Sequence, residues 1–107
     1  MKRIFLILAA LALFAASATA APLTNEERQA TIDFVLGLQN EDEGFRATPE
    51  RGPSSLGATN SCLRALKYLG AKAPCVTRFV FVCTDASGGF VDMPGTAPTV
   101  RTTAMGL

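Results

Sequence analysis

The sequence contains no histidine among its 107 residues. Nucleophilic sites of the Ser-His-Asp and Cys-His kinds use an imidazole as the base that activates the nucleophile. Without histidine, neither kind of site can be assembled from this chain. The absence of this one residue type therefore excludes both classes of enzyme.

The sequence also lacks clusters of lysine and arginine. Once Lys2 and Arg3 are set aside, eight basic and nine acidic residues remain, a net charge of −1. Proteins that bind nucleic acids concentrate basic residues on one face. Here Arg64, Lys67 and Lys72 are spread along one predicted helical unit, which indicates a solvated surface. We expect no nucleic-acid partner.

Long apolar runs are missing too, except for residues 4–16 near the N-terminus. This run follows Lys2-Arg3 and precedes Ala18-Thr19-Ala20, the pattern of a secretory signal peptide. A membrane span needs about 20 apolar residues, so cleavage after Ala20 is favoured over an uncleaved anchor. We expect a signal peptide at residues 1–20 and one small domain at residues 21–107. The protein should be exported, to the periplasm or outside the cell, with no stable membrane anchor after cleavage.

What the chain does contain is a repeat. A shift of 45 positions without gaps superposes Phe34 on Phe79 and Gly44-Phe45 on Gly89-Phe90. A fixed period of this length is typical of stacked two-helix units. Glycine can end a helix in the left-handed conformation, and the phenylalanine after it can turn back and fill the joint. We interpret these loop residues as structural joints: Gly44, Phe45, Gly88, Gly89 and Phe90.

Local patterns predict the first two helices. Thr24 and Glu27 form a capping box, and the helix that follows should end near Gln39 or Asn40. Its apolar spacing predicts a buried stripe of Thr31, Phe34, Val35 and Leu38. Ser54 or Ser55 caps the second helix and Gly70 follows its end. The predicted stripe of this second helix comprises Cys62, Ala65, Leu66 and Leu69.

The third and fourth helices are predicted from the repeat. Ala73-Pro74 suits the first turn of a helix. The segment Phe79-Val80-Phe81-Val82 alone prefers a strand, but its match to the first helix favours a helix with a stripe of Val76, Phe79, Val80 and Cys83. A fourth helix should start at Thr99. With the shift of 45, Leu107 corresponds to Cys62, in the middle of the second helix.

These elements predict an all-α fold of about two α–α hairpin repeats. Because no end signal follows the fourth helix, we expect an incomplete copy of the array, either a fragment or a truncated or decayed copy. Such an array leaves a flank uncovered, so self-association or instability is expected.

The three cysteines allow two interpretations. In an oxidising compartment, one disulfide and one spare thiol can form. A hairpin turn near Gly70 would bring Cys62 and Cys83 toward the same open end, which makes them the candidate pair. Alternatively, all three are small buried apolar side chains, because free cysteine packs readily.

The loops and helices together resemble a known repeat. Residues 34–45, an apolar helix followed by Gln39-Asn40, acidic residues and Gly44-Phe45, resemble the repeat of protein prenyltransferase β subunits and terpenoid cyclases. Residues 79–95 resemble a second copy, and residues 63–70 resemble the helix that follows each loop. The resemblance implies a partial α–α toroid, in which helices after each loop line an apolar isoprenoid-binding cavity. Glu43 departs from the glycine of that pattern, which indicates an altered or strained loop.

The resemblance also implies where zinc would bind. Protein prenyltransferases hold zinc with an Asp-x-Cys pair at the start of an inner helix and a distant histidine, and the metal activates the substrate thiol. Here those positions are Ser55, Gly57 and Arg101. A register displaced by a whole repeat does not restore the set, because histidine is absent. The aspartate-rich acid motif of the cyclases is missing as well. We expect no zinc, no other cofactor and no assignable catalytic residue.

Two functions stay open, beside a third possibility, an unstable remnant with no function. The first is an exported prenyltransferase- or terpenoid-cyclase-like protein, related by resemblance to isoprenoid transfer but catalytically incomplete by itself. The second is a non-catalytic helical-repeat module that binds a protein or glycan. The expected partner is accordingly an isoprenoid or a protein.

Overall fold

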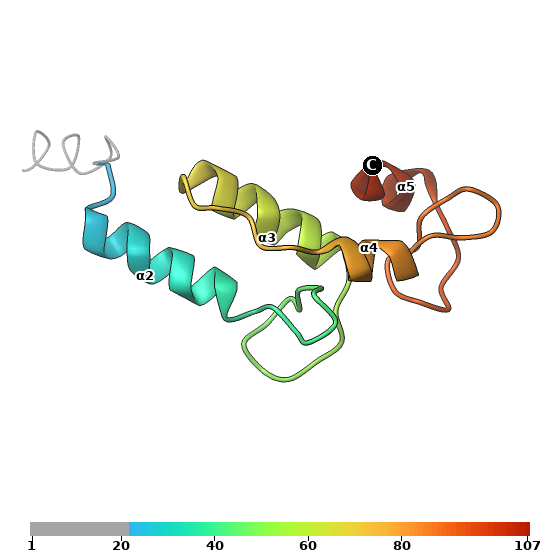
Figure 1. Ribbon diagram of the computed structural model, residues 1–107, viewed down its shortest axis with the longest axis horizontal. Coiled ribbons are helices and arrows are strands. Elements are labelled where there is room, and N and C mark those ends of the chain that lie inside the picture. Colours follow the sequence, from blue (N-terminus) through green and yellow to red (C-terminus); the bar gives the residue numbers. More distant parts are fainter. Residues whose placement is uncertain (1–21) are drawn as a thin grey trace, which may run out of the picture.

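The computed structural model describes residues 22–107, and in this range it contains helices and no strand (Figure 1). This confirms the predicted all-α fold. The predicted signal peptide at residues 1–20 lies outside the described residues. The helices, in chain order, are α2 (Asn25–Leu36), α3 (Leu56–Tyr68), α4 (Thr77–Val82) and α5 (Val100–Gly106). Within residues 22–107, none of them combines the length and apolar character that a membrane crossing needs.

Helix α2 begins as predicted and ends earlier. The Thr24 hydroxyl accepts a hydrogen bond from the Glu27 amide at 3.1 Å, and the Glu27 carboxylate accepts one from the Thr24 amide at 3.0 Å. The helix ends at Leu36 and not near Gln39 or Asn40. The reason is the loop that follows, because Gln39 pairs with Phe45 in an isolated β-bridge and is drawn out of the helical path.

The buried stripe of α2 is narrower than predicted. Val35 and Leu38 are buried, but Thr31 is exposed and the Phe34 side chain is 56% exposed. Ile32 packs against the core instead. The prediction that Thr31 and Phe34 are buried is therefore wrong, because the described part of the chain places no element over that face of α2.

Helix α3 agrees closely with the sequence. Its N-cap is Ser55, whose hydroxyl accepts from the Ala58 amide at 3.1 Å. Gly70 follows the helix end with a φ of +74°, a conformation that favours glycine. Cys62 and Leu66 are buried as predicted, and Ala65 packs at the edge of the same cluster.

Helix α4 is shorter than predicted. It begins at Thr77 and not at Ala73-Pro74, because residues 71–76 run as an extended segment back along α3 (Figure 1). Gln39 holds this segment by donating from its side-chain amide to the Cys75 carbonyl at 3.1 Å. Phe79 is buried, whereas Phe81 is 73% exposed. The segment Phe79-Val80-Phe81-Val82 is helical as its match to the first helix predicts, and Phe81 lies on the solvent side of that helix.

The two Gly-Phe loops have the same backbone conformation. The Asn40 amide donates to the Gly44 carbonyl at 2.8 Å, and 45 positions later the Asp85 amide donates to the Gly89 carbonyl at 2.8 Å. Glu43 has a φ of +74°, and its equivalent Gly88 has a φ of +92°. The period of 45 is therefore real in the loops. Glu43 is strained where the resembling repeat has glycine.

After each loop, equivalent residues of the two hairpins are 44 positions apart instead of 45. The Phe45 amide donates to the Thr59 hydroxyl at 3.0 Å, and the Phe90 amide donates to the Thr103 hydroxyl at 3.1 Å. The N-caps follow the same offset, since Ser55 caps α3 and Thr99 caps α5. One residue fewer lies in the second loop. Gly106, and not Leu107 as we expected, is thus equivalent to Cys62.

Each hairpin caps a helix of the other. The Glu43 carboxylate accepts from the Arg78 amide in the first turn of α4 at 3.1 Å, and α4 has no side-chain cap of its own. In return, Asp92 accepts through its carbonyl from the Leu56 amide at 2.7 Å and through Oδ1 from the Gly57 amide at 2.9 Å. We call this set of contacts the hairpin joint. It fixes the N-terminal end of α3 against the second loop.

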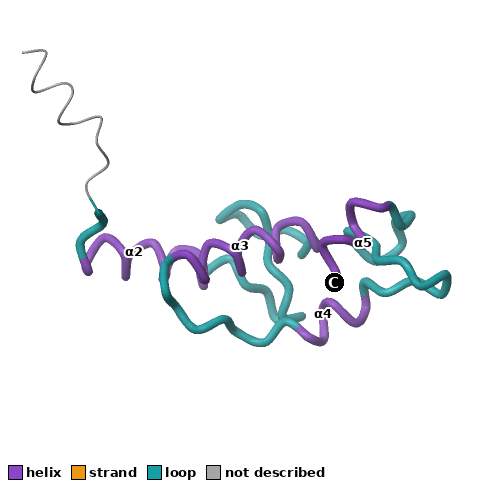
Figure 2. The backbone as a smooth tube through the Cα atoms, turned by 90° about the horizontal axis from the view of Figure 1, so that it is seen from above, coloured by secondary structure: helices purple, strands orange, loops and turns teal. Residues whose placement is uncertain are grey.

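Two apolar clusters form the core. The first contains Val35, Leu38, Phe45, Cys62 and Leu66. The second contains Leu56, Phe79, Cys83 and Val91. Leu56 starts α3 in the first hairpin but belongs to the cluster of the second, so the clusters are joined through α3. Figure 2 shows α3 running from α2 toward α5 along the length of the molecule.

Candidate functional site

The candidate site is a hollow where α3 and α5 begin. Its lining includes Ser55, Gly57 and Arg101, the three positions that the sequence singled out, and its volume is about 370 Å³. The structure therefore brings together residues 46 positions apart in the chain, because α3 packs against α5. Thr102 and Met105 of α5 complete the wall together with Asp92.

The hollow is built from equivalent positions of two helices. With the offset of 44, Arg101 on α5 corresponds to Gly57 on α3, and Thr99 corresponds to Ser55. The Thr99 hydroxyl accepts from the Thr102 amide at 3.0 Å, as the Ser55 hydroxyl accepts from Ala58. Both cap residues are thus occupied in starting their helices.

Asp92 is the acidic residue of this hollow, and sequence reasoning did not find it. Its Oδ1 accepts from the Gly57 amide, so its negative charge lies at the positive N-terminal end of α3. The repeat gives no signal for it, because the equivalent position in the first loop is Ala47. Its partner amides lie 35 or more residues away, beyond the reach of any local pattern.

Two segments of the chain, residues 1–78 and residues 71–107, match the family model described as the prenyltransferase alpha-alpha toroid domain. The chain therefore belongs to the prenyltransferase α–α toroid family. The two matches overlap in the stretch between α3 and the start of α4, which agrees with two consecutive toroid repeats. The comparison with curated proteins and the comparison with solved structures found no match.

The residues of this toroid hollow do not fit the family's zinc. Ser55 already uses its hydroxyl as a helix cap, Gly57 has no side chain, and Arg101 brings a positive charge. Zinc needs three or four Cys, His or carboxylate ligands. No group of three or more such side chains is placed to hold a metal ion within residues 22–107. We therefore derive no chemical step through zinc in this toroid.

The loop residues of the toroid pack as joints. Phe45 is fully buried in the first cluster, and Phe90 is half-buried beside the second. Gly44 lies in close contact with its surroundings, since a Cβ there would be 2.5 Å from the Ser54 Cβ and 2.6 Å from the Phe79 Cγ. Gly88 instead has open space and a positive φ. Space thus favours glycine at position 44 and, with a Cβ at Gly89 only 2.9 Å from the Pro98 Cβ, at the equivalent position 89, whereas conformation favours it at position 88.

The three cysteines carry free thiols in this structure. Cys62 is buried in the first cluster and Cys83 in the second, while Cys75 is exposed. The two thiols pack in different parts of the core, and the disulfide between Cys62 and Cys83 stays a prediction. Burial raises the pKa of the Cys62 thiol, and burial together with the charges of Asp92 and Asp42 raises the pKa of the Cys83 thiol.

These raised pKa values predict a loss of stability in alkali. An unfolded cysteine ionises near pH 8.5, whereas the folded thiols ionise at higher pH. Their contribution to stability is fully present below the unfolded pKa and is lost as the pH rises through the folded pKa. The free energy of unfolding, measured in urea between pH 7 and 10, should therefore fall above about pH 8.5. We expect a shallower fall for Cys83→Ala, with Cys75→Ser as the control because Cys75 is exposed. Identical slopes for wild type and Cys83→Ala would contradict this explanation.

Proposed function

We propose that the chain is an exported pair of prenyltransferase-like toroid hairpins that is related to isoprenoid transfer but does not catalyse it alone. One observation supports this above the others. The hollow at the start of α3 and α5 gathers Ser55, Gly57 and Arg101, the positions at which the resemblance expects the zinc ligands, and none of the three is a zinc ligand. In this proposed function, the protein uses neither zinc nor another cofactor.

The family and one apolar surface support an isoprenoid as the substrate class. The toroid family supports an isoprenoid as the small-molecule partner. The described residues include an apolar surface that an isoprenoid chain could contact. One hollow on α4 and the second loop, about 330 Å³ in volume, is lined mainly by apolar side chains. Its residues are Val76, Thr77, Val80, Phe81, Thr84 and Phe90. Two hairpins would form part of a cavity wall, and a whole cavity would need further units.

Zinc analysis of the purified protein tests the proposal. We expect far less than one equivalent of zinc after exposure to the metal, and no product from a prenyl diphosphate and a thiol peptide with zinc added. The positive control is the triple variant Ser55→Asp, Gly57→Cys, Arg101→His, which supplies the family's three ligand types in the same hollow. Its zinc content should exceed that of the wild type. Stoichiometric zinc or prenyl transfer by the wild-type chain would overturn the proposal.

The second candidate function is a non-catalytic module that binds a protein or glycan. The observation that favours it is the exposure of Phe81 and Val82 on one short helix, α4. Exposed neighbouring apolar side chains mark surfaces that a partner covers. This candidate also requires no catalytic residue, no nucleic acid and no membrane anchor. Val82 is exposed but does not line the apolar hollow on α4, so loss of partner binding in Val82→Ser, with the fold and isoprenoid binding retained, would distinguish this candidate from the first.

A further inference from the structure

The hairpin joint also contains an apolar contact, and this contact shows how one hairpin packs on another. Phe79 of the second hairpin is 1% exposed, and it lies in the same buried cluster as Leu56 of the first, which is also 1% exposed. Gly44 provides the space for the Phe79 ring, because a Cβ at that position would be 2.6 Å from the ring. The first hairpin thus presents Leu56 and Gly44, and the second inserts Phe79.

The equivalent residues at the two free faces of the pair are uncovered. Phe34 occupies the repeat position of Phe79 but is 56% exposed, and Val100 occupies the position of Leu56 but is 90% exposed. The same residue positions are therefore buried where two hairpins meet and exposed where the described residues provide no neighbouring hairpin. Each exposed face carries residues equivalent to one side of the hairpin joint, so the two faces are complementary to each other.

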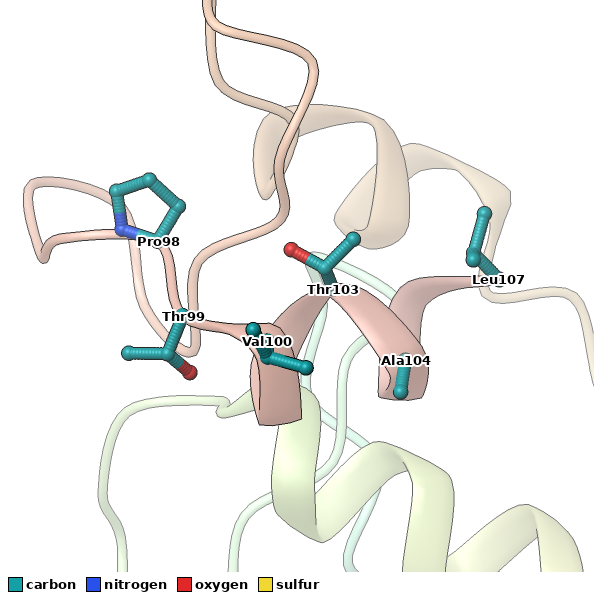
Figure 3. A pocket seen from close by; sticks show the side chains of 6 residues that line it. All are labelled: Pro98, Thr99, Val100, Thr103, Ala104 and Leu107. Atoms are coloured by element: carbon teal, nitrogen blue, oxygen red, sulfur yellow. The ribbon is translucent and has the colours of Figure 1, made fainter.

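The face around Val100 is hollowed and mainly apolar. Figure 3 shows Val100 and Ala104 on α5 and Leu107 directly after its end, with Pro98 and Thr99 leading into the helix. A Cβ at Gly89, the equivalent of Gly44, would lie nearest to Pro98, at 2.9 Å from its Cβ, and not to a phenylalanine ring as at Gly44. The residue nearest to this glycine thus differs between the two hairpins.

We propose that this face binds a second copy of the same chain, head to tail. The α2 face of one copy, carrying Phe34, packs on the α5 face of the next, carrying Val100, as α4 packs at the start of α3 within each chain. Such a contact joins two different surfaces, so it continues from copy to copy, into a ring if the rotation closes and an open chain if it does not, and it does not stop at a two-fold dimer. The occupant is inferred from continuity with the joint already present in the molecule.

The contact between copies lacks the polar part of the hairpin joint. The positions of Glu43 and Asp92, which cap helices across the joint, hold Gly88 and Ala47 at the free faces. In the hairpin joint, the small Gly57 contacts the larger Asp92. In the contact between copies, the equivalent residues are the large Arg101 and the small Ala47, so each pair combines one small and one large residue. The association therefore rests on apolar contact and is weaker than the joint, which makes it dependent on protein concentration.

Charge also favours this arrangement of the two faces. Helix α2 carries Glu26, Glu27 and Asp33 against a single Arg28, whereas the charged residue of α5 is Arg101. An acidic helix facing a basic one is attracted, and the attraction weakens as salt increases. A contact between two α2 faces would instead bring like charges together. Association should thus decrease with added salt, but only partly, because its core is apolar.

Complementary variants test the proposal by sedimentation velocity. The average mass of the purified wild-type chain should rise with concentration. Phe34→Asp removes one face and Val100→Asp the other, and each variant alone should associate at least tenfold more weakly. An equimolar mixture retains one intact face of each kind, so it should form a discrete dimer of one copy of each variant. Phe34→Ser repeats the test with a milder change, and circular dichroism checks that the variants keep their helices.

Several outcomes would overturn the proposal. A wild-type chain that stays monomeric at all concentrations would show that something other than a second copy covers Val100. Dimers of Val100→Asp alone would indicate a symmetric contact between α2 faces. Association that survives both substitutions would place it elsewhere, including in residues 1–20. The control is Tyr68→Asp, an aromatic side chain that is 80% exposed at the far end of α3, and it should associate like the wild type.

Discussion

Truncation of Phe79 to alanine is expected to lower the free energy of unfolding by about 3–5 kcal/mol, the usual cost of removing a fully buried phenylalanine. Phe79 is among the largest fully buried side chains of the described residues. Its ring fills the space over Gly44 and belongs to the cluster that contains Leu56. A domain of this size is stable by roughly 4–13 kcal/mol in total. The loss should therefore bring the protein close to unfolding, as measured by urea denaturation followed by circular dichroism.

Phe34→Ala is the matched control for this prediction. It removes the same side chain from the equivalent position of the other repeat, where the ring is largely exposed. We expect a change below about 1 kcal/mol, because surface substitutions rarely cost more. If Phe79→Ala is too unstable to measure, Phe79→Leu gives a smaller loss in the same direction. Equal losses for Phe34→Ala and Phe79→Ala would contradict the arrangement of the hairpin joint.

Replacement of Gly44 by alanine should destabilise the fold by about 3 kcal/mol, at the upper end of the cost of overpacking. The added Cβ would lie 2.5 Å from the Ser54 Cβ and 2.6 Å from the Phe79 Cγ, and both of those side chains are buried. They cannot move aside without disturbing the hairpin joint. For a chain of this length, the loss corresponds to a fall in Tm of roughly 12–24 °C. Differential scanning calorimetry measures it directly.

Gly52→Ala is the control for the Gly44 variant. A Cβ at Gly52 would meet nothing closer than the Glu50 carbonyl oxygen at 3.9 Å, so we expect no loss and a gain of up to about 1 kcal/mol from the stiffer unfolded chain. Combining Gly44→Ala with Phe79→Ala should cost less than the sum of the two, because the second change removes the ring that the first one meets. Full additivity would show that the added methyl group meets resistance elsewhere.

The sequence predicted those parts of the fold that depend on near neighbours. The capping box of Thr24 and Glu27, the Ser55 cap and the turn at Gly70 each involve residues within a few positions, and the structure confirms all of them. Burial was predicted less well. Phe34 and Phe79 share the same pattern of neighbours, yet only Phe79 is buried, because burial depends on whether another hairpin packs over the helix.

The candidate site was predicted in position but not in its contacts. The resemblance named Ser55, Gly57 and Arg101, and the structure places them in one hollow. The acidic residue among them, Asp92, could not be found, because it acts on a helix 35 residues earlier in the chain. The gapless shift of 45 also concealed the change of offset to 44 after the loops. That one-residue difference makes Gly57 the counterpart of Arg101.

The exchange of helix caps across the hairpin joint has a consequence for how the molecule opens. Glu43 lies in the loop of one hairpin and holds the first turn of α4, while Asp92 lies in the other loop and holds the first turn of α3. If the two hairpins separate, the amides in the first turns of α3 and α4 both lose their carboxylate acceptors. The two hairpins should therefore open together as one cooperative unit, and a fluctuation that exposes the Arg78 amide to exchange with solvent should expose the Gly57 amide at the same rate.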